Sequence, residues 1–484
     1  MLSTISFILD GKIRSINFDQ DRRYTPTTTL LNFLRSLPYH KGTKEGCAEG
    51  DCGACTVVIA EETKNNKIVY RAIDSCLVFL PMIHGKQLIT VENLKTDDGQ
   101  LHPVQQAVVE TNGSQCGFCT PGIVMSLFAL YKNYTNPSRA DIEESLSGNL
   151  CRCTGYVPLV EAAKIACTQK KKDHFAVKEK TIARLLKKIP QKSIHIKLKQ
   201  QNYFSPSTLK EALQLRYKYP QADLINGATD IALRVTKKYE RLSSVIDLSS
   251  IIVLRGIAEK KKYCLIGSGV RLSELKKYTK KKFPAFFDLL SVFGSVQIRN
   301  LATIGGNLGT ASPIGDIAPL LIAYQAEIIL RSKKNKRVIA IDDFIKGYRK
   351  TACRKDELIV AIKLPYPSKN TQIRFYKFSK RKDVDISTVS GGFRLELDSD
   401  ETVKKIILAF GGMAETISRA KKTEKFFNGK TWDRQTIEKA CSILESEFEP
   451  ITDARASAQG RSIAAKNLLI KFWFDTTHSN RKPD

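Results

Sequence analysis

Residues 115–122 read QCGFCTPG, and residues 150–155 read LCRCTG. Each segment carries a close pair of cysteines, and the apolar residues between the segments repeat at helical spacing. Close cysteine pairs on two loops are more typical of a metal site than of disulfides in a chain without a secretory leader. The sequence therefore predicts a metal centre in this region, with ligands Cys116, Cys119, Cys151 and Cys153.

A second set of cysteines lies upstream. The stretch 46–55 reads GCAEGDCGAC, with spacing C-x4-C-x2-C, and another cysteine follows after 20 intervening residues. This is the plant-type spacing for a [2Fe–2S] cluster, and glycines let the backbone approach the sulfurs closely. A zinc loop is the alternative, because C-x2-C also occurs there, but the x4 spacing and the following strand favour iron–sulfur. The predicted ligands are Cys47, Cys52, Cys55 and Cys76.

The length and composition bound the class of protein. At roughly 150 residues per domain, 484 residues suggest about three domains, and a hydrophobic fraction of 42% fits a globular chain. The N-terminus alternates like a strand and lacks the apolar core of a signal peptide. No apolar run reaches the roughly 18 residues that a membrane span needs. We expect a cytoplasmic protein with reduced thiols and no membrane partner.

The net charge of +29 raises the question of an acidic partner. The lysines are spread along the chain, as in 170–172, 276–282 and 331–337, with no recognisable nucleic-acid-binding motif beside them. A solvated surface is therefore favoured over a nucleic-acid-binding patch. We also find no nucleophile–base arrangement and no paired carboxylates, so no catalytic residue is predicted on this chain.

The spacing of apolar residues divides the first half of the chain into three parts. Residues 1–90 read as short strands and turns, with a hairpin predicted at Asp10-Gly11 and a helix over Thr27–Leu37. Residues 91–168 switch to helical spacing, over Val104–Glu110, Pro121–Tyr131, Arg139–Leu146 and Val157–Cys167. Residues 169–200 are basic and polar, with a short amphipathic piece near Ile182–Ile189, and are predicted to be a linker.

The second half alternates strands with helices. Residues 222–230 form a strand that enters a polar turn, and residues 297–316 contain the densest glycine run of the chain. Such loops let backbone N–H groups approach diphosphate oxygens. A structural turn explains one glycine loop equally well, but two loops flanked by Asp indicate a nucleotide cofactor. Neither is a Rossmann fingerprint or a Walker A loop.

The three cysteine motifs GCAEGDCGACTVVI, QCGFCTPG and GNLCRCTGY together resemble the iron–sulfur part of the molybdenum hydroxylases, the xanthine dehydrogenase group. The resemblance implies two [2Fe–2S] clusters, one in a ferredoxin-like β-grasp domain (1–90) and one in a four-helix bundle (91–168). It places the second cluster nearer a molybdenum centre and the first nearer a flavin. It also implies that Gln115 contacts the pterin of a molybdenum cofactor held by another polypeptide or domain.

The motifs INGATD and ATIGGNLGTASPIGD resemble the FAD-binding segments of the same family. This implies a vanillyl-alcohol-oxidase-like FAD domain over 201–375, followed by a C-terminal α+β flavoprotein subdomain over 376–484. Thr310 and Asp316 are implied to lie near the adenosine half or the ribityl chain. The residues implied to hold the diphosphate are Leu224, Ile225, Asn226, Gly227, Ala228, Thr229, Asp230, Thr303, Ile304, Gly305, Gly306 and Asn307.

At some positions the residue leaves open the role that the family resemblance implies. Phe293 aligns with an aromatic residue beside the isoalloxazine, but an ordinary core Phe is an equally good interpretation. Some relatives have Lys at the position of Thr388, where it contacts FAD, so that contact is expected to be weakened. Val157 stands where many relatives carry Arg, and Ile417 where Pro is common.

The resemblance as a whole implies an α+β multidomain chain that is the iron–sulfur and flavin subunit of a xanthine dehydrogenase. Electrons would pass from a molybdenum centre on a large partner subunit to FAD and then to NAD, during hydroxylation of hypoxanthine or xanthine to urate. A heterotetramer of two small and two large chains is implied. One alternative is another molybdenum hydroxylase of the aldehyde, nicotinate or CO dehydrogenase type. An alternative of another class is an iron–sulfur regulator that binds nucleic acid.

Overall fold

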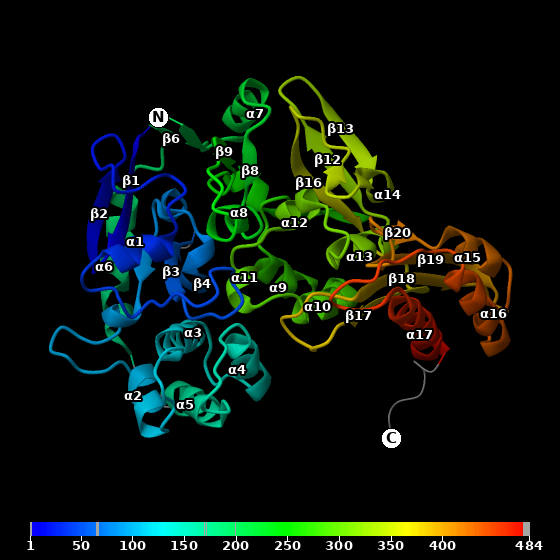
Figure 1. The fold of residues 1–484 in the computed structure, drawn as a ribbon, viewed down its shortest axis with the longest axis horizontal. Coiled ribbons are helices and arrows are strands. Elements are labelled where there is room, and N and C mark those ends of the chain that lie inside the picture. Colours follow the sequence, from blue (N-terminus) through cyan, green and yellow to red (C-terminus); the bar gives the residue numbers. More distant parts are fainter. Residues whose placement is uncertain (1, 64–66, 169, 171, 199, 478–484) are drawn as a thin grey trace. The chain divides into compact units, whose positions relative to one another are not determined.

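The computed structural model describes residues 2–63, 67–168, 170, 172–198 and 200–477 (Figure 1). The chain separates into two compact units, Met1–Ile252 with Gly294–Ala302, and Val253–Phe293 with Thr303–Asp484. The division after residue 252 falls inside the range 201–375 that the sequence predicts as one domain. The fold class is confirmed as α+β with several domains.

The N-terminal sheet of the first unit has five strands in the order β2-β1-β5-β3-β4, with β1 and β5 parallel and the other neighbours antiparallel. The predicted hairpin is confirmed, because Asp10 and Gly11 both have positive φ between β1 and β2. Helix α1 begins where the Thr29 side chain accepts a hydrogen bond from Asn32 N. The elements are β1 (Thr4–Leu9), β2 (Lys12–Asn17), α1 (Leu30–Ser36), β3 (Thr56–Glu62), β4 (Ile68–Asp74), η1 (Ser75–Leu77), η2 (Leu80–Ile83), β5 (Gln87–Ile89) and η3 (Val91–Asn93).

The helical part of this unit matches the predicted helices closely. Its elements are α2 (Pro103–Glu110), α3 (Thr120–Asn133), α4 (Arg139–Leu146) and α5 (Val157–Thr168). Helix α3 is buried from Gly122 to Tyr131 and packs against β3, β4 and the other three helices (Figure 1). Helix α4 starts at a capping box formed by Ser138 and Asp141.

The range 169–200, predicted as a linker, contains regular structure: α6 (His174–Lys188) and β6 (Ile194–Leu198). Helix α6 buries Phe175, Ile182, Ala183 and Leu186, which join the core of the helical part. The prediction was wrong in its secondary structure because many lysines mask an apolar stripe at helical spacing. Asp173 caps this helix and forms a buried ion pair with Lys132, 2.9 Å away.

A four-stranded sheet in the order β6-β7-β9-β8 completes the first unit. Its inner side chains, such as Ile196, Tyr203 and Val245, belong to the same core as those of the N-terminal sheet. This shared core is the reason that the sheet belongs to the first unit. The remaining elements are β7 (Gln201–Ser205), α7 (Leu209–Lys218), β8 (Asp223–Ile225), α8 (Ala232–Thr236), β9 (Ser244–Asp247) and α11 (Val296–Arg299).

The second unit begins with an antiparallel sheet in the order β10-β11-β16-β12-β13. The helix η4 (Ile252–Arg255) spans the division between the units. Strands of this sheet and its hairpin are β10 (Ile257–Glu259), β11 (Tyr263–Gly267), β12 (Glu327–Arg331), β13 (Lys336–Ala340), β14 (Ile345–Gly347), β15 (Lys350–Thr351) and β16 (Leu358–Pro365). Helices are α9 (Leu272–Lys282), α10 (Pro284–Ser291), α12 (Ile304–Thr310), α13 (Ile317–Ala323) and α14 (Ile341–Phe344).

The C-terminal part is the predicted small sheet with helices. Its antiparallel order is β17-β18-β19-β20, and α17 packs its buried side against β17 and β18. The core is aromatic, and the Phe393 ring contacts the rings of both Phe410 and Phe472. The elements are β17 (Thr371–Phe378), β18 (Val389–Leu397), β19 (Val403–Gly411), β20 (Ser418–Arg419), α15 (Lys421–Phe427), α16 (Arg434–Glu445) and α17 (Ala458–Thr477).

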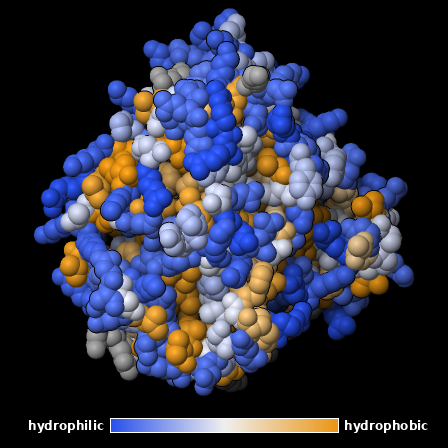
Figure 2. All heavy atoms as spheres, turned by 60° about the vertical axis from the view of Figure 1, so that its left-hand side comes forward, coloured by the Kyte–Doolittle hydropathy of each residue, from blue (hydrophilic) through white to orange (hydrophobic). Residues whose placement is uncertain are grey.

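The surface reflects the basic composition. On the face drawn in Figure 2, hydrophilic residues cover most of the area and hydrophobic residues form scattered patches. Within the described part of the chain, every helix is too short or too polar to cross a membrane.

Two candidate iron–sulfur sites and the predicted FAD segments

The first set of cysteines lies on the glycine-rich loop before β3 and on η1. Cys55 Sγ is 3.4 Å from Cys76 Sγ, and both side chains are buried. Cys47 and Cys52 form the other pair, in which the Cys47 N–H lies 3.3 Å from Cys52 Sγ. The fold thus brings the four predicted ligands together as two pairs.

Backbone N–H groups of the loop point at the Cys47 sulfur. The N–H groups of Glu49, Asp51 and Cys52 each lie 3.4 Å from Cys47 Sγ. A hydrogen bond from the Cys52 thiol, together with these N–H groups, lowers the pKa of Cys47 to about 5 although burial opposes the shift. Gly50, with φ of 82°, allows the turn that aims them. The loop is therefore built to stabilise negative charge on sulfur.

A buried carboxyl lies beside the first set, which the sequence did not indicate. Asp74 Oδ1 accepts a hydrogen bond from the Cys55 thiol at 3.8 Å, and Asp74 is fully buried. Burial and then the nearby Cys47 charge raise the pKa of Asp74 well above its usual value. The pKa of Cys55 is also raised, first by its hydrogen bond to Cys76 and then by burial. The only signal was the position of Asp74 two residues before a predicted ligand.

The second set precedes α3 and α5 and is more open. Cys116 Sγ lies 3.7 Å from Cys153 Sγ, and both residues are exposed. Burial and the contact with Cys151 raise the pKa of Cys119 to about 12. Burial opposes ionisation of Cys151, but hydrogen bonds from Thr154, whose Oγ1 is 3.2 Å from Cys151 Sγ, help to lower its pKa to about 7. The four thiols of this set also lie as two pairs, Cys116 with Cys153 and Cys119 with Cys151.

The paired arrangement fits the predicted clusters. A [2Fe–2S] cluster takes four thiolates, two on each of its irons. Among the residues that the structure describes, no group of three or more His, Cys, Asp or Glu side chains gathers around one point to hold a single ion. Two pairs of thiols in each set are the ligand type that a two-iron cluster takes, and in the first set the N–H groups near Cys47 would stabilise charge on its sulfur.

The two sets are joined through the backbone. The Leu150 N–H, one residue before Cys151, donates to the Cys52 carbonyl at 2.9 Å. A Cβ at Gly53 would lie 2.1 Å from the Gly148 carbonyl oxygen, and a Cβ at Gly122 only 2.2 Å from the Gly53 carbonyl oxygen. Only glycine permits so close an approach.

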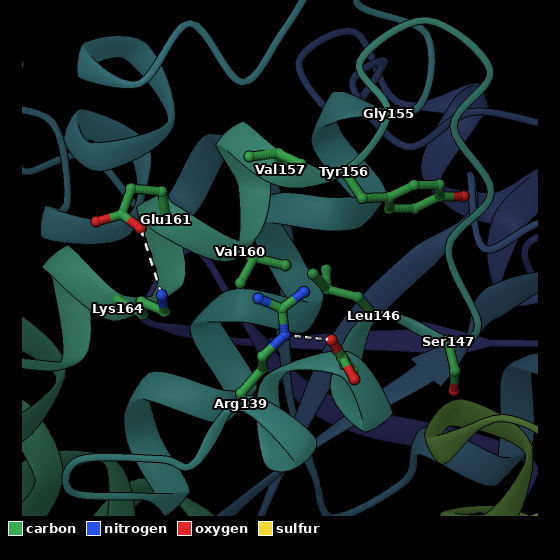
Figure 3. Close-up of a pocket in the computed structure, with 10 residues that line it drawn as sticks. Arg139, Leu146, Ser147, Gly155, Tyr156, Val157, Val160, Glu161 and Lys164 are labelled. Atoms are coloured by element: carbon green, nitrogen blue, oxygen red, sulfur yellow. Dashed lines mark hydrogen bonds and ion pairs between the residues drawn. The ribbon is translucent and has the colours of Figure 1, made fainter.

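A pocket of about 300 Å³ lies between α4 and α5, beside the loop of the second set (Figure 3). Val157, which departs from the family's Arg, lines it and is 75% exposed. Ion pairs Arg139–Glu143 and Lys164–Glu161 border the apolar side chains. Its lining residues are Arg139, Glu143, Leu146, Ser147, Gly155, Tyr156, Val157, Val160, Glu161 and Lys164. None of them is a predicted site residue, and Gln115 is exposed elsewhere on this helical part.

The predicted FAD segment of the first unit follows β8. Gly227 and Ala228 both have positive φ, 97° and 61°, so the chain turns sharply after Asn226. A Cβ at Gly227 would lie 2.0 Å from the Leu301 carbonyl oxygen, which makes glycine necessary here. Thr229 and Asp230 are half-buried, so part of their polar surface is accessible.

Helix α8 follows this segment and brings a cation to the first cysteine loop. Lys237 Nζ lies 3.1 Å from the Cys47 carbonyl oxygen and 3.4 Å from a Glu49 carboxylate oxygen. The sequence did not indicate this contact because 190 residues separate Lys237 from Cys47.

The predicted FAD segment of the second unit differs from the expected loop. Thr303 caps α12 by accepting from Gly306 N at 3.1 Å, so Ile304–Thr310 is helical. Gly305 N donates to the Ser268 carbonyl at 2.9 Å, and a Cβ at Gly305 would lie 2.5 Å from Ser268 Cβ. The Ser268 hydroxyl is buried without a hydrogen-bond partner among the described residues. The Gly305 and Gly306 N–H groups are therefore used within the protein, and the Ser268 hydroxyl is the polar group here that fits a ligand such as a diphosphate.

Two other predicted FAD residues are used within the protein. Asp316 accepts from the Ser387 hydroxyl at 2.5 Å and forms a buried ion pair with Lys377 at 3.1 Å. Thr388 is buried, and its carbonyl accepts a hydrogen bond from Arg461. Phe293 is half-buried, just after α10. The Asp316 carboxylate is therefore already neutralised by a lysine that the sequence did not single out.

Comparisons with known proteins agree with this architecture. Residues 90–164 match a [2Fe-2S] binding domain, residues 197–367 the FAD binding domain in molybdopterin dehydrogenase, and residues 374–476 the CO dehydrogenase flavoprotein C-terminal domain. Xanthine dehydrogenase of Emericella nidulans is 35% identical over 98% of the chain, and xanthine dehydrogenase/oxidase of Mus musculus is 31% identical over 94%. The chain spans 38% of the length of each of these two relatives.

Solved structures show the same fold at lower sequence identity. A carbon monoxide dehydrogenase chain from Hydrogenophaga pseudoflava matches with a TM-score of 0.53 and 24% identity, covering 56% of this chain and 94% of that chain. A chain of quinoline 2-oxidoreductase from Pseudomonas putida 86 matches with a TM-score of 0.52 and 23% identity, covering 56% of this chain and 95% of that one.

Proposed function

The chain is homologous to the N-terminal part of the xanthine dehydrogenases, and on that premise we propose that it is the electron-transfer half of such an enzyme. The observation that carries the proposal is the occurrence, in one chain, of two sets of paired thiols and an FAD-binding domain. When bound, the clusters carry single electrons and FAD links one-electron with two-electron chemistry. In this proposal the molybdenum centre lies on the large partner subunit that the family resemblance implies.

The chain's own residues hold and tune these carriers. The N–H groups around Cys47 and the hydroxyl of Thr154 stabilise negative charge on sulfur, which sets the affinity for iron and the reduction potential. Burial of Cys55 and Cys76 keeps water from one side of the first site. The proposed cluster ligands are the eight cysteines Cys47, Cys52, Cys55, Cys76, Cys116, Cys119, Cys151 and Cys153.

The proposed FAD contacts are those that the family resemblance implies: Leu224 to Asp230, Thr303 to Asn307, Thr310, Asp316, Phe293 and Thr388. The exposed part of the turn after Gly227 and the unsatisfied hydroxyl of Ser268 beside Gly305 each support a polar-ligand role for its own segment. Because Asp316 is paired with Lys377, its carboxylate serves to anchor a loop as well as to face a cofactor.

The finer proposal is oxidation of hypoxanthine and xanthine to urate in the cytoplasm, with NAD as the acceptor and two copies of each chain in the complex. It is supported by the names of two relatives that match nearly all of this chain. Gln115 is exposed, as contact with a pterin on the partner requires. An aldehyde, nicotinate or CO dehydrogenase would share this half, so the substrate preference of the co-purified complex distinguishes these enzymes.

The proposal is tested by measuring iron, acid-labile sulfide, zinc and FAD in the anaerobically purified chain. We expect about four irons, four sulfides and one FAD per chain. Zinc in place of iron, or no flavin after reconstitution, would overturn the proposal. A nucleic-acid-binding regulator would instead bind DNA or RNA with an affinity that falls steeply with salt.

A further inference from the structure

A buried polar cluster lies between the two cysteine sets. It is formed by Ser126 on α3, Asn149 before Cys151, and Gln297 on α11, which are 2%, 1% and 0% exposed. Gln297 Nε2 donates to Asn149 Oδ1 at 2.8 Å and to Ser126 Oγ at 3.0 Å. Ser126 Oγ donates to Asn149 Oδ1 at 2.6 Å. The amide of Asn149 is thereby held from two sides.

The other end of the Asn149 side chain holds the first cysteine loop. Its Nδ2 donates to the Gly53 carbonyl at 3.0 Å and to Thr56 Oγ1 at 3.1 Å. The next residue, Leu150, donates its N–H to the Cys52 carbonyl at 2.9 Å. Asn149 thus connects the segment that leads into the second set with the loop that carries the first.

Stability alone does not explain this cluster of buried polar side chains. Gln297 Oε1 is buried and has no hydrogen-bond partner among the described residues. An unsatisfied buried acceptor lowers stability, whereas well-packed apolar side chains would not. Two other side chains already hold this segment, because Asn300 donates to the Ala72 carbonyl at 2.9 Å and Arg299 pairs with Glu144. Gln297 is the one of the three that contacts Asn149.

We propose that Gln297 and Asn149 are positioning residues that fix the separation between the two cysteine sets. The inference rests on the proposed function, because it assumes a cluster in each set. Gln297 orients the Asn149 amide, and Asn149 keeps the Gly53 carbonyl and the Leu150 N–H in place. A hydrogen bond with a defined direction sets one register between two loops, which apolar packing does not.

The test uses the full chain loaded with iron, sulfide and FAD, and reduced anaerobically with dithionite. The readout is the magnetic coupling between the two reduced clusters in the electron paramagnetic resonance spectrum, which depends on their separation and orientation. Gln297→Met removes both donors and keeps the volume. We expect normal iron and FAD contents with a reduced or lost splitting.

Asn300→Leu is the matched control, because it removes one buried amide hydrogen bond from the same segment without touching Asn149. We expect it to keep the splitting of the unmodified chain. An unchanged splitting in Gln297→Met, or an equal loss in Asn300→Leu, would overturn the inference.

A second variant tests the inference if Gln297→Met does not bind its iron–sulfur clusters. Gln297→Asn keeps the amide but is one methylene shorter, so it cannot reach both Asn149 and Ser126. We expect full loading with a weakened splitting, and an unchanged splitting overturns the inference. If the unmodified chain binds no iron or no FAD, the proposed function itself fails. If it binds two clusters and FAD but shows no splitting, only the inference is overturned, so the two failures are distinguishable.

Discussion

Each of the two cysteine sets offers four thiols, but the two sets differ in how far their cysteines are buried. In the first, Cys55 and Cys76 are 2% and 1% exposed, and backbone N–H groups surround the Cys47 sulfur. In the second, Cys116 and Cys153 are exposed at the surface of a helical bundle. An enclosed site keeps its cluster from solvent, whereas an exposed site can exchange electrons with something docked on it. The difference teaches that burial of a cysteine set is decided by the surrounding packing and not by the type or number of its residues.

The largest effect is expected from replacing a ligand in each set. Cys55→Ser should remove the first cluster and also destabilise the N-terminal core, because its sulfur is buried beside Asp74. Cys153→Ser should remove the second cluster while the rest of the fold persists. In each variant the iron content should fall by about half. Iron analysis with thermal unfolding checks this.

Cys353→Ser is the control for both variants, because this cysteine is half-buried and lies far along the chain from either set. It should keep all of the iron. A loss of iron in the control, or equal destabilisation in Cys55→Ser and Cys153→Ser, would contradict the contrast between an enclosed and an exposed site.

The next prediction separates two reasons why a position requires glycine: close contact with another backbone segment, and a positive φ angle. Gly53 and Gly117 both have positive φ, 68° and 80°, but only Gly53 is against another backbone. Gly117→Ala should cost about 1–2 kcal/mol through its conformation. Gly53→Ala should cost roughly 1–3 kcal/mol more through overpacking. Urea unfolding of the loaded protein measures both, and equal costs would show that the contact with Gly148 does not matter.

A smaller effect concerns the order in which iron is lost. An iron chelator added under mild anaerobic conditions should remove the second cluster before the first, because Cys116 and Cys153 are exposed. The spectra of Cys153→Ser and Cys55→Ser identify the cluster that remains. Loss of the first cluster before the second would mean that the loop around Cys47 opens more readily than the structure suggests.

The smallest expected effect is on the reduction potential of the second cluster. Thr154→Val removes the hydroxyl that lies 3.2 Å from Cys151 Sγ. Losing a hydrogen bond of about 1 kcal/mol should lower the midpoint potential of the second cluster by roughly 40 mV and leave the first unchanged. A redox titration followed by electron paramagnetic resonance measures both potentials. Thr154→Ser, which keeps the hydroxyl, should restore the original value.

Several elements were predictable because their signals are local. The bounds of α4 agree with the predicted Arg139–Leu146, since a capping box and a 3.6-residue repeat are both contained within the segment. The cysteine spacings indicated both metal sites for the same reason. Helix α6 was predicted only as a short amphipathic piece near Ile182–Ile189 because its lysines outweigh its apolar stripe, and α12 was missed because a run of glycines resembles a loop.

Sequence alone determined how the cysteines group along the chain and predicted the helices from α2 to α5, because spacing and capping act over a few residues. The tertiary structure decided which sulfurs pair, that Asp74 lies beside Cys55, and that Gln297 reaches Asn149 across 148 positions. It also decided that Gly53 must be glycine, since the Gly148 carbonyl fills the space of a side chain. Contacts between distant segments depend on how whole elements pack, and no local pattern records that packing.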